Sequence, residues 1–396
     1  MPAISVGFAS LVLAYALSQF YRAFLAVLSP ALSVELGASA GDLTLSSGLW
    51  FLTFAAMQLP IGWSLDRFGP RRTVALLLAL GGAGGAAIFA LASAPWHLHL
   101  AMALLGIGCA PILMGAYYIF AREYPPATFG TLAGVIVAVG SLGNILGAAP
   151  LVRVIEMAGW RMTLWGLAAI TLAVAGLIAW LLRDPARLED HHPKGSLTEV
   201  LRLRALWFIL PLFFFSYAAS AAIRGLWAAP YLEQVFGADE VTIGRVTLAM
   251  GLAMVAGSFL VGPAARMAGG VRRTVLIFTA VTLLVLLALM LFGSASIALS
   301  ALLLMLIGLS GASYALLMAH GRTFLPPHLV GRGVTFLNMF SIGGVGVMQF
   351  AARPVFQAAT AAGPPEFAFA MLFLFFLIPL LIGYILYFLT SEAQYV

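Results

Sequence analysis

The stretch GWSLDRFGPRR, residues 62–72, is where the sequence first shows which fold it specifies. It lies between two apolar runs, near 43–65 and 73–93, and places four charged residues, Asp66, Arg67, Arg71 and Arg72, in a short connection. Runs of about twenty apolar residues cross a bilayer as helices, and the arginines between such helices collect on the cytoplasmic side. The segment therefore predicts a short cytoplasmic loop between two membrane-spanning helices.

The composition of the whole chain agrees with a membrane protein. Of its 396 residues 63% are hydrophobic and 9% are charged, whereas an ordinary soluble domain is roughly 45–50% apolar and about 25% charged. The apolar runs lack the alternation of barrel strands, so we expect helices. Cys109 is the only cysteine, which excludes an internal disulfide and any CxxC site, and we expect no cofactor. The arginines punctuate the apolar runs instead of clustering, which argues against a nucleic-acid partner.

Twelve apolar runs fall into two sets of six, which predicts an all-α polytopic membrane protein with two pseudo-symmetric six-helix bundles. The longest polar segment, residues 183–204, separates the sets and contains His191, His192 and Lys194, the only lysine. We therefore expect an N-terminal bundle over 1–182, a cytoplasmic linker over 183–205 and a C-terminal bundle over 206–396. The expected spans are 8–32, 43–65, 73–93, 98–121, 130–152, 162–182, 206–232, 244–265, 274–293, 297–320, 332–355 and 367–390.

The two sets are related by an internal repeat. REYPPATFG (122–130) and TFLPPHLVG (323–331) share PPxxxG at an offset of 201, and PALSVELG (30–37) and PYLEQVFG (230–237) share a Pro-to-Gly spacing at an offset of 200. Arg153 and Arg353 repeat the offset of 200. Two six-helix repeats with a substrate site at their interface are the architecture of a secondary transporter.

Residues 62–72 also carry a family resemblance. GWSLDRFGPRR resembles the GxxxDRxGxRR signature of the major facilitator superfamily, and topology and repeat extend the resemblance over nearly the whole chain. It implies a transporter, not an enzyme, that rocks its two halves around a central cavity. By the same resemblance Gly62, Asp66, Arg67, Gly69, Arg71 and Arg72 form a conformational latch. The second copy, GPAARMAGGVRR (262–273), has Arg266 where the first has Asp66, so its latch contacts are in doubt.

Arg22 and Arg224 are the candidate substrate ligands, because each is a charge inside an apolar run. A mid-membrane arginine is costly and is usually functional. They lie in the first and seventh runs, which are repeat partners, and all 14 carboxylates lie outside the middle of the spans. Two planar guanidinium groups suit a carboxylate or phosphate, and the pair resembles those of the organic-anion and organophosphate branches of the family. The further candidate ligands are polar or aromatic residues on likely cavity helices: Gln19, Tyr117, Tyr118, Trp227 and Asn338.

Alternative functions remain open. Met250 and Met254 lie one turn apart and suit a soft metal ion such as Cu(I), which favours a copper or other metal importer as a second interpretation. A multidrug exporter is a third, although no mid-membrane carboxylate is present, and a non-transporting receptor on the same scaffold is a fourth. The histidine of the tenth run, His320, is a candidate titrating group.

Orientation and partners follow from the charges. Of the 20 basic residues four lie on the predicted outer loops, Arg22 and Arg224 lie within spans, and the remaining 14 lie on the other side. This asymmetry predicts cytoplasmic N- and C-termini. We expect a bacterial inner-membrane protein that acts by alternating access, with antiport of a small organic anion, as a monomer in the lipid bilayer.

Overall fold

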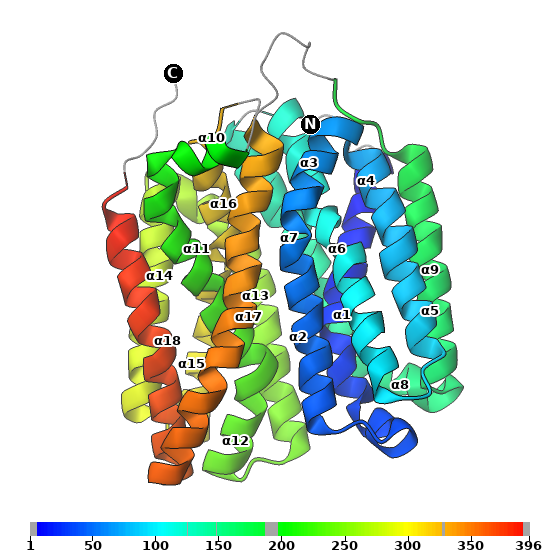
Figure 1. The fold of residues 1–396 in the computed structure, drawn as a ribbon. Coiled ribbons are helices and arrows are strands. Elements are labelled where there is room, and N and C mark those ends of the chain that lie inside the picture. Colours follow the sequence, from blue (N-terminus) through cyan, green and yellow to red (C-terminus); the bar gives the residue numbers. More distant parts are fainter. Residues whose placement is uncertain (1–5, 125, 148, 187–196, 327–328, 391–396) are drawn as a thin grey trace. The chain divides into compact units, whose positions relative to one another are not determined.

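The computed structural model describes residues 6–124, 126–147, 149–186, 197–326 and 329–390, and all regular structure in these ranges is helical (Figure 1). The first half of the chain contains α1 (Val6–Leu36), α2 (Ala40–Ala56), α3 (Gln58–Phe68), α4 (Pro70–Leu77), the π-helical η1 (Leu78–Ala83), α5 (Gly84–Ala90), α6 (Pro95–Glu123), α7 (Pro126–Leu146), α8 (Ala149–Ala158) and α9 (Trp160–Leu181). The second half contains α10 (Leu197–Arg202), α11 (Arg204–Ala222), the π-helical η2 (Ile223–Trp227), α12 (Ala228–Phe236), α13 (Glu240–Met267), α14 (Val271–Phe292), α15 (Ile297–Ser310), η3 (Gly311–Ser313), α16 (Tyr314–Arg322), α17 (Val330–Ala362) and α18 (Pro365–Phe388).

The predicted all-α polytopic class is confirmed. Among the described residues ten helices are long and apolar enough to cross a membrane. Two further pairs, Gly41–Ala56 with Gln58–Phe68 and Leu132–Leu146 with Pro150–Ala158, are bent by 42° and 43°, and counting each pair as one span gives twelve. These bent pairs are the second and fifth spans of the sequence prediction.

The chain forms two compact units. Unit 1 contains the described residues of Met1–Leu132, Val139–Leu197 and Pro326–Met339, and unit 2 contains those of Ala133–Ala138, Thr198–Leu325 and Phe340–Val396. The fifth and eleventh spans are thus each divided, because a short part of each belongs to the other unit. The predicted domain boundaries at 182 and 206 stay a prediction.

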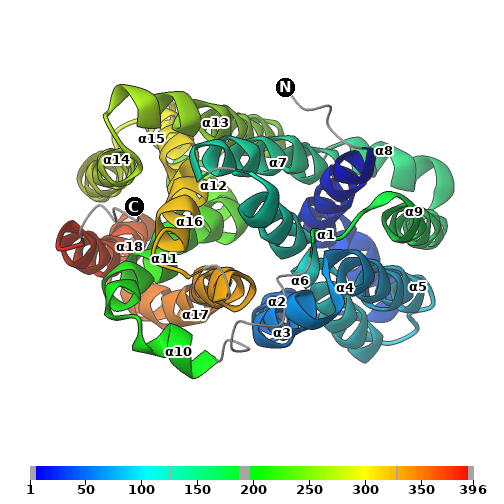
Figure 2. The same ribbon diagram turned by 90° about the horizontal axis from the view of Figure 1, so that it is seen from above.

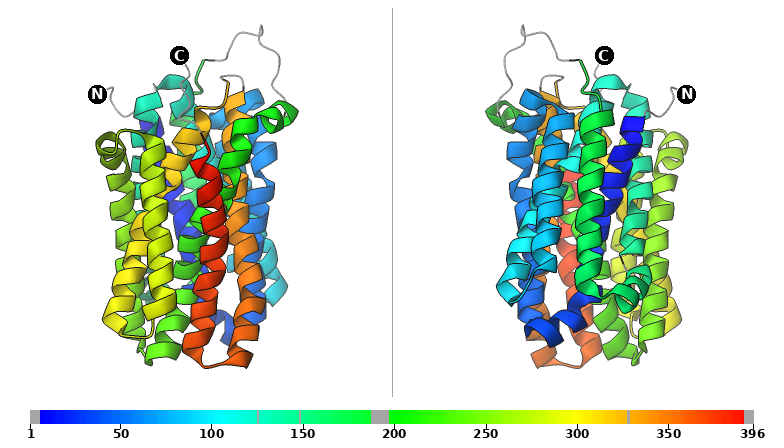
Figure 3. Two further views of the ribbon diagram at one scale, coloured as in Figure 1. Left: turned by 90° about the vertical axis from the view of Figure 1, so that its left-hand side faces the viewer. Right: turned by 90° about the vertical axis from the view of Figure 1, so that its right-hand side faces the viewer.

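Helices pack in the same pattern within each unit. In unit 1, α6 packs on α2 and on the α4–η1–α5 span, and α9 packs on α1 and on that same span. In unit 2, α15 packs on α13 and α14, and α18 packs on α11 and α14; Figure 3 shows α18 in red with α11 and α14 beside it. Seen from above in Figure 2, α13 and α15 lie side by side. The repeated pattern is what an internal duplication predicts.

The helix caps repeat the 200-residue offset at atomic detail. Gly37 and Gly237 have φ of 64° and 62°, a left-handed conformation that glycine adopts without strain. In each copy the next residue donates a backbone hydrogen bond to the carbonyl five residues before the glycine, at 3.3 Å in the first copy and 3.2 Å in the second. The following N-caps, Ser39 and Asp239, both have φ −74° and ψ 163°. The PxxxxxxG pattern therefore marks the same helix stop and start in both halves.

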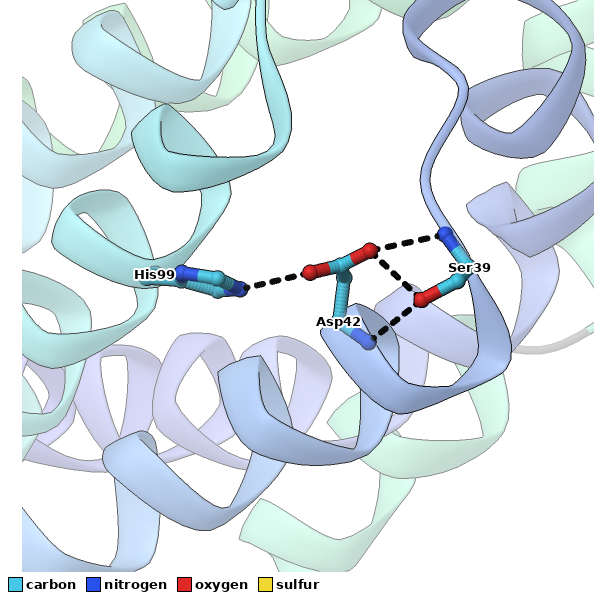
Figure 4. A network of polar contacts seen from close by, with 3 residues as sticks. All are labelled: Ser39, Asp42 and His99. Carbon is cyan, nitrogen blue, oxygen red and sulfur yellow. Dashed lines mark hydrogen bonds and ion pairs between the residues drawn. The ribbon is translucent and has the colours of Figure 1, made fainter.

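The first of these caps is also tied to a neighbouring helix. In Figure 4 the Asp42 carboxylate accepts hydrogen bonds from the backbone N–H of Ser39 at 2.9 Å and from its hydroxyl at 2.6 Å, and the Ser39 hydroxyl accepts one from the Asp42 N–H at 3.2 Å. His99 Nε2, in the first turns of α6, lies 3.6 Å from the other Asp42 oxygen. This capping box satisfies donors that a helix start leaves open, and His99 ties the start of α2 to α6.

Two local features go beyond what the sequence indicated. The predicted linker over 183–205 contains α10, and α11 begins at Arg204. The third and seventh spans each contain a π-helical segment, which no periodicity in the sequence indicated. His191, His192 and Lys194 lie outside the described residues.

Candidate functional site

Arg22 lies near the middle of α1 and is half-buried. Its Cζ is 4.8 Å from the ring centroid of Trp50 and 5.3 Å from that of Phe54, both on α2. The two rings are stacked on each other, with centroids 4.9 Å apart and planes at 28°. Since a guanidinium group is attracted to the face of an aromatic ring and stacks flat on it, this aromatic pair orients the Arg22 side chain.

Arg224 lies in the π-helical segment η2, in the middle of the long span from Arg204 to Phe236. It is half-buried and lies against α13 at Gly251: a Cβ atom built there would be 3.1 Å from Nη2 and 3.5 Å from both Cζ and Nε. Similar distances to three guanidinium atoms mean that the group faces the bare backbone of α13. Single π-helical turns inside α-helices occur frequently at functional sites, and here the π turn carries the candidate ligand.

The two arginines differ from the acidic residues in their position along the helices. Every described Asp and Glu lies in a connection, in the short α10 or within the first or last few residues of a helix, whereas Arg22 and Arg224 are in mid-span. Arg22 belongs to unit 1 and Arg224 to unit 2. Their convergence on one anion therefore stays a prediction.

The other candidate ligands are buried and make contacts within the protein. Gln19 donates a hydrogen bond to the Tyr15 hydroxyl at 3.0 Å, and Asn338 donates one to the side-chain carbonyl of Gln58 at 2.9 Å within unit 1. These amides are thus already oriented. In Tyr118 the hydroxyl accepts a hydrogen bond from Arg122 at 2.9 Å.

The aromatic candidates pack against other rings. The Tyr117 ring is fully buried with its centroid 5.4 Å from that of Phe129. The Trp227 ring lies 4.8 Å from that of Phe356, and its indole Nε1 has no hydrogen-bond partner among the residues that the structure describes. The Trp227 ring thus packs against Phe356, and its role as a substrate ligand stays a prediction.

Asp66 contacts the N-terminal turn of α17, within unit 1. The Arg332 Nε lies 3.5 Å from an Asp66 carboxylate oxygen, and both side chains are about one-fifth exposed. A Cβ at Gly331 would overlap the other carboxylate oxygen, and the positive end of a helix favours a carboxylate there. A Cβ at Gly62 would overlap the Thr335 hydroxyl, so glycine is what lets α3 approach α17 this closely. Asp66, a predicted latch residue, thus has a basic partner in Arg332.

Of the other predicted latch residues, Arg71 contacts the end of α9, Gly69 caps α3, and Arg67 and Arg72 are exposed. The Arg71 backbone N–H donates to Asp184 at 2.7 Å, and its side-chain Nε donates to the Ala179 carbonyl at 2.6 Å. Gly69 has a φ of 85° and caps α3, while Arg67 lies over Trp63 with Cζ 5.7 Å from the ring centroid. Arg72 is exposed. The loop is thus tied to both α17 and α9.

Met250 and Met254, the residues of the metal-importer interpretation, are part of the helix packing. The Cγ atoms of Met250 and Met254 lie 3.2 and 3.3 Å from the Cβ position of Gly308, so this pair fills the contact between α13 and α15. Among the described residues no three His, Cys, Asp or Glu side chains group as a metal site would require. His320 is buried, with Nδ1 2.8 Å from the Tyr387 hydroxyl.

Comparison with known proteins identifies the fold and the family. Residues 11–349 match the model of the Major Facilitator Superfamily. A probable sulfoacetate transporter of Cupriavidus necator is 24% identical over 63% of this chain and 62% of its own length. A quinolone resistance transporter of Acinetobacter baumannii is 23% identical over 59% of this chain and 60% of its own length. Each match thus spans less than two thirds of the relative. The human organic anion transporter MFSD10 has a similar structure, with a TM-score of 0.73 and 18% identity over 97% of this chain and 100% of that one.

Proposed function

We propose that this chain, which belongs to the Major Facilitator Superfamily, is an integral membrane transporter that carries a small organic anion. The observation that supports the anion is the placement of Arg22 and Arg224 in mid-span, with the described carboxylates at helix ends and in connections. A guanidinium group offers five donors in a planar fork that suits carboxylate, sulfonate or phosphate oxygens. The similarity to a probable sulfoacetate transporter points in the same direction.

We further propose that one anion binds both arginines in a central cavity that opens alternately to either side of the membrane. Secondary transporters built from repeats bind their substrates near the bilayer midplane, between the repeats. Gln19, Tyr117, Tyr118, Trp227 and Asn338 are the proposed additional ligands. The excess of arginine on the predicted inner loops supports a bacterial cytoplasmic membrane with both termini inside, where the protein acts as a monomer.

The test uses purified protein in liposomes and a panel of four anions: sulfoacetate, malonate, sulfate and glycerol 3-phosphate. We expect uptake of at least one anion and its loss in Arg22→Gln and Arg224→Gln, while both variants remain folded by thermal unfolding. Lysine should restore transport poorly, because it is a point charge without the bidentate fork. Arg353→Gln, an exposed arginine of α17, is the control and should transport normally. Uptake at the normal rate by both glutamine variants contradicts the proposal.

Drug export is a second candidate, because the chain also resembles a quinolone resistance transporter. The same liposomes distinguish the two functions when they are loaded with a fluoroquinolone. Export that survives both Arg→Gln substitutions favours the drug exporter, whereas anion uptake that depends on the arginines favours the anion carrier.

A further inference from the structure

The repeat relates the surroundings of the two arginines residue by residue. Trp50 and Met250 are 200 residues apart and occupy equivalent places: a Cβ at Gly106 of α6 would overlap the Trp50 carbonyl oxygen, and one at Gly308 of α15 would lie 2.5 Å from that of Met250. Phe54 then corresponds to Met254, and Phe51 to Gly251. The positions that cover Arg22 with aromatic rings in unit 1 are therefore methionines in unit 2.

Those methionines do not replace the aromatic pair, because both pack against Gly308. The Arg224 guanidinium meets α13 one residue further along, at Gly251, where the first half has a large aromatic ring. Glycine in mid-helix is disfavoured relative to alanine, since it loses more conformational freedom. Helix stability thus gives no reason for glycine at position 251, but the guanidinium does, because even a methyl group would stand against its face.

We propose that Gly251 and the Trp50–Phe54 pair are positioning residues that set the affinity of the anion site, by seating Arg224 on bare backbone and Arg22 on aromatic rings. This inference rests on the proposed function. The two arrangements differ: in the first half the aromatic rings of Trp50 and Phe54 contact the guanidinium group, and in the second half the absence of a side chain at Gly251 leaves room for it. Each arrangement fixes the plane of a guanidinium group, and bidentate recognition of an anion requires that plane to be fixed.

The unit 2 test compares two alanine variants on the same helix. Gly251→Ala should displace the Arg224 fork, because the added Cβ would lie 3.1 Å from Nη2 and the guanidinium group must give way by a few tenths of an ångström. Since bidentate recognition depends on the orientation of the fork, we expect anion binding to weaken by roughly three- to tenfold. Gly244→Ala is the matched control: it lies on α13, and nothing is within 4 Å of its Cβ position. Binding of the four panel anions is measured by calorimetry, and KM and kcat by uptake. Gly251→Ala should raise KM more than it lowers kcat.

The unit 1 test asks whether the ring face matters, beyond the volume of the side chain. Trp50→Phe keeps an aromatic face and should bind within about threefold of the unmodified protein, whereas Trp50→Leu should bind about tenfold more weakly, because the cation–π contact is lost. In an Arg224→Lys background Gly251→Ala should have a smaller effect, since lysine presents no flat group to displace.

Three results separate the possible failures. Loss of binding in Arg224→Gln together with normal binding in Gly251→Ala overturns this inference and leaves the proposed function intact. Retained binding in Arg22→Gln and Arg224→Gln, or no binding of any panel anion by the unmodified protein, overturns both. If Gly251→Ala does not fold, the test depends on the two Trp50 variants. Equal anion binding by Trp50→Leu and Trp50→Phe would contradict the role of the aromatic pair and therefore the inference.

Discussion

At the scale of single residues, glycine has two distinct uses in this chain. Gly37 and Gly237 supply a left-handed turn, whereas Gly143 in α7 supplies room. A Cβ at Gly143 would overlap the carbonyl oxygen of Ala16 on α1, and one at Gly140 would overlap the ring of Tyr15. Glycine at these two positions is therefore what lets α7 pack closely on α1.

A single methyl group tests the second use. Gly143→Ala should destabilise the protein by about 1–3 kcal/mol, because inserting a methyl group into a filled contact forces side chains and backbone to shift. Gly176→Ala on α9 is the matched control: nothing lies within 4 Å of its Cβ position, so it should be neutral or slightly stabilising. Thermal unfolding of the purified variants measures the difference. Equal melting temperatures would show that α1 and α7 do not pack this tightly.

At the scale of elements, the 62–72 segment, where α3 meets α4, contacts α17 and the end of α9 within unit 1. Asp66 reaches the first turn of α17, and Arg71 reaches the end of α9. The contact with α17 connects a loop of the first half of the sequence to the eleventh span, so it is suited to hold one conformation of a transporter. It lies at a helix end, whereas Arg22 and Arg224 lie in mid-span.

Asp66→Asn should therefore change the rate of transport more than the affinity for the anion. Removal of the charge weakens the contacts with Arg332 and with the positive end of α17, while the mid-span arginines are unchanged. Uptake in liposomes and binding by calorimetry should then separate, with uptake reduced and binding retained. Glu156→Gln, which neutralises an exposed acid paired with Arg153, is the control. Binding reduced as strongly as uptake would exclude the latch role.

What the sequence predicts well is whatever repeats or depends on neighbouring residues. The spans follow from apolar length, and the internal repeat follows from landmarks such as Gly37 and Gly237 that recur at a fixed offset. The π turn around Arg224 was not predictable, because a π turn is a rare local departure from the α-helical hydrogen-bond pattern and has no sequence periodicity of its own. The partners of Arg22 and Asp66 were equally hidden: Trp50 and Arg332 are recognisable only once α2 and α17 are placed beside them.

At the scale of the whole molecule, the charge of the proposed site constrains how transport is coupled. Every described carboxylate lies in a connection or near a helix end, so a cavity that contains Arg22 and Arg224 is about two charges positive when it is empty. Charge in a space from which water is excluded is unfavourable. Return of the empty carrier through a closed state is thus expected to be slow, and a bound anion lowers this barrier by cancelling charge.

Exchange of one anion for another should therefore be faster than net uptake. We expect internal anion to accelerate uptake of external anion several-fold in proteoliposomes at zero membrane potential. The panel anion with the highest uptake is compared in loaded and empty vesicles across a pH series. Any pH dependence should follow the ionisation of the anion itself or of His320, which is buried beside Tyr387. Two results together would refute exchange: equal uptake rates in loaded and empty vesicles, and proton-driven accumulation of sulfate that survives His320→Gln. A proton would then be carried by a group that this charge distribution does not provide.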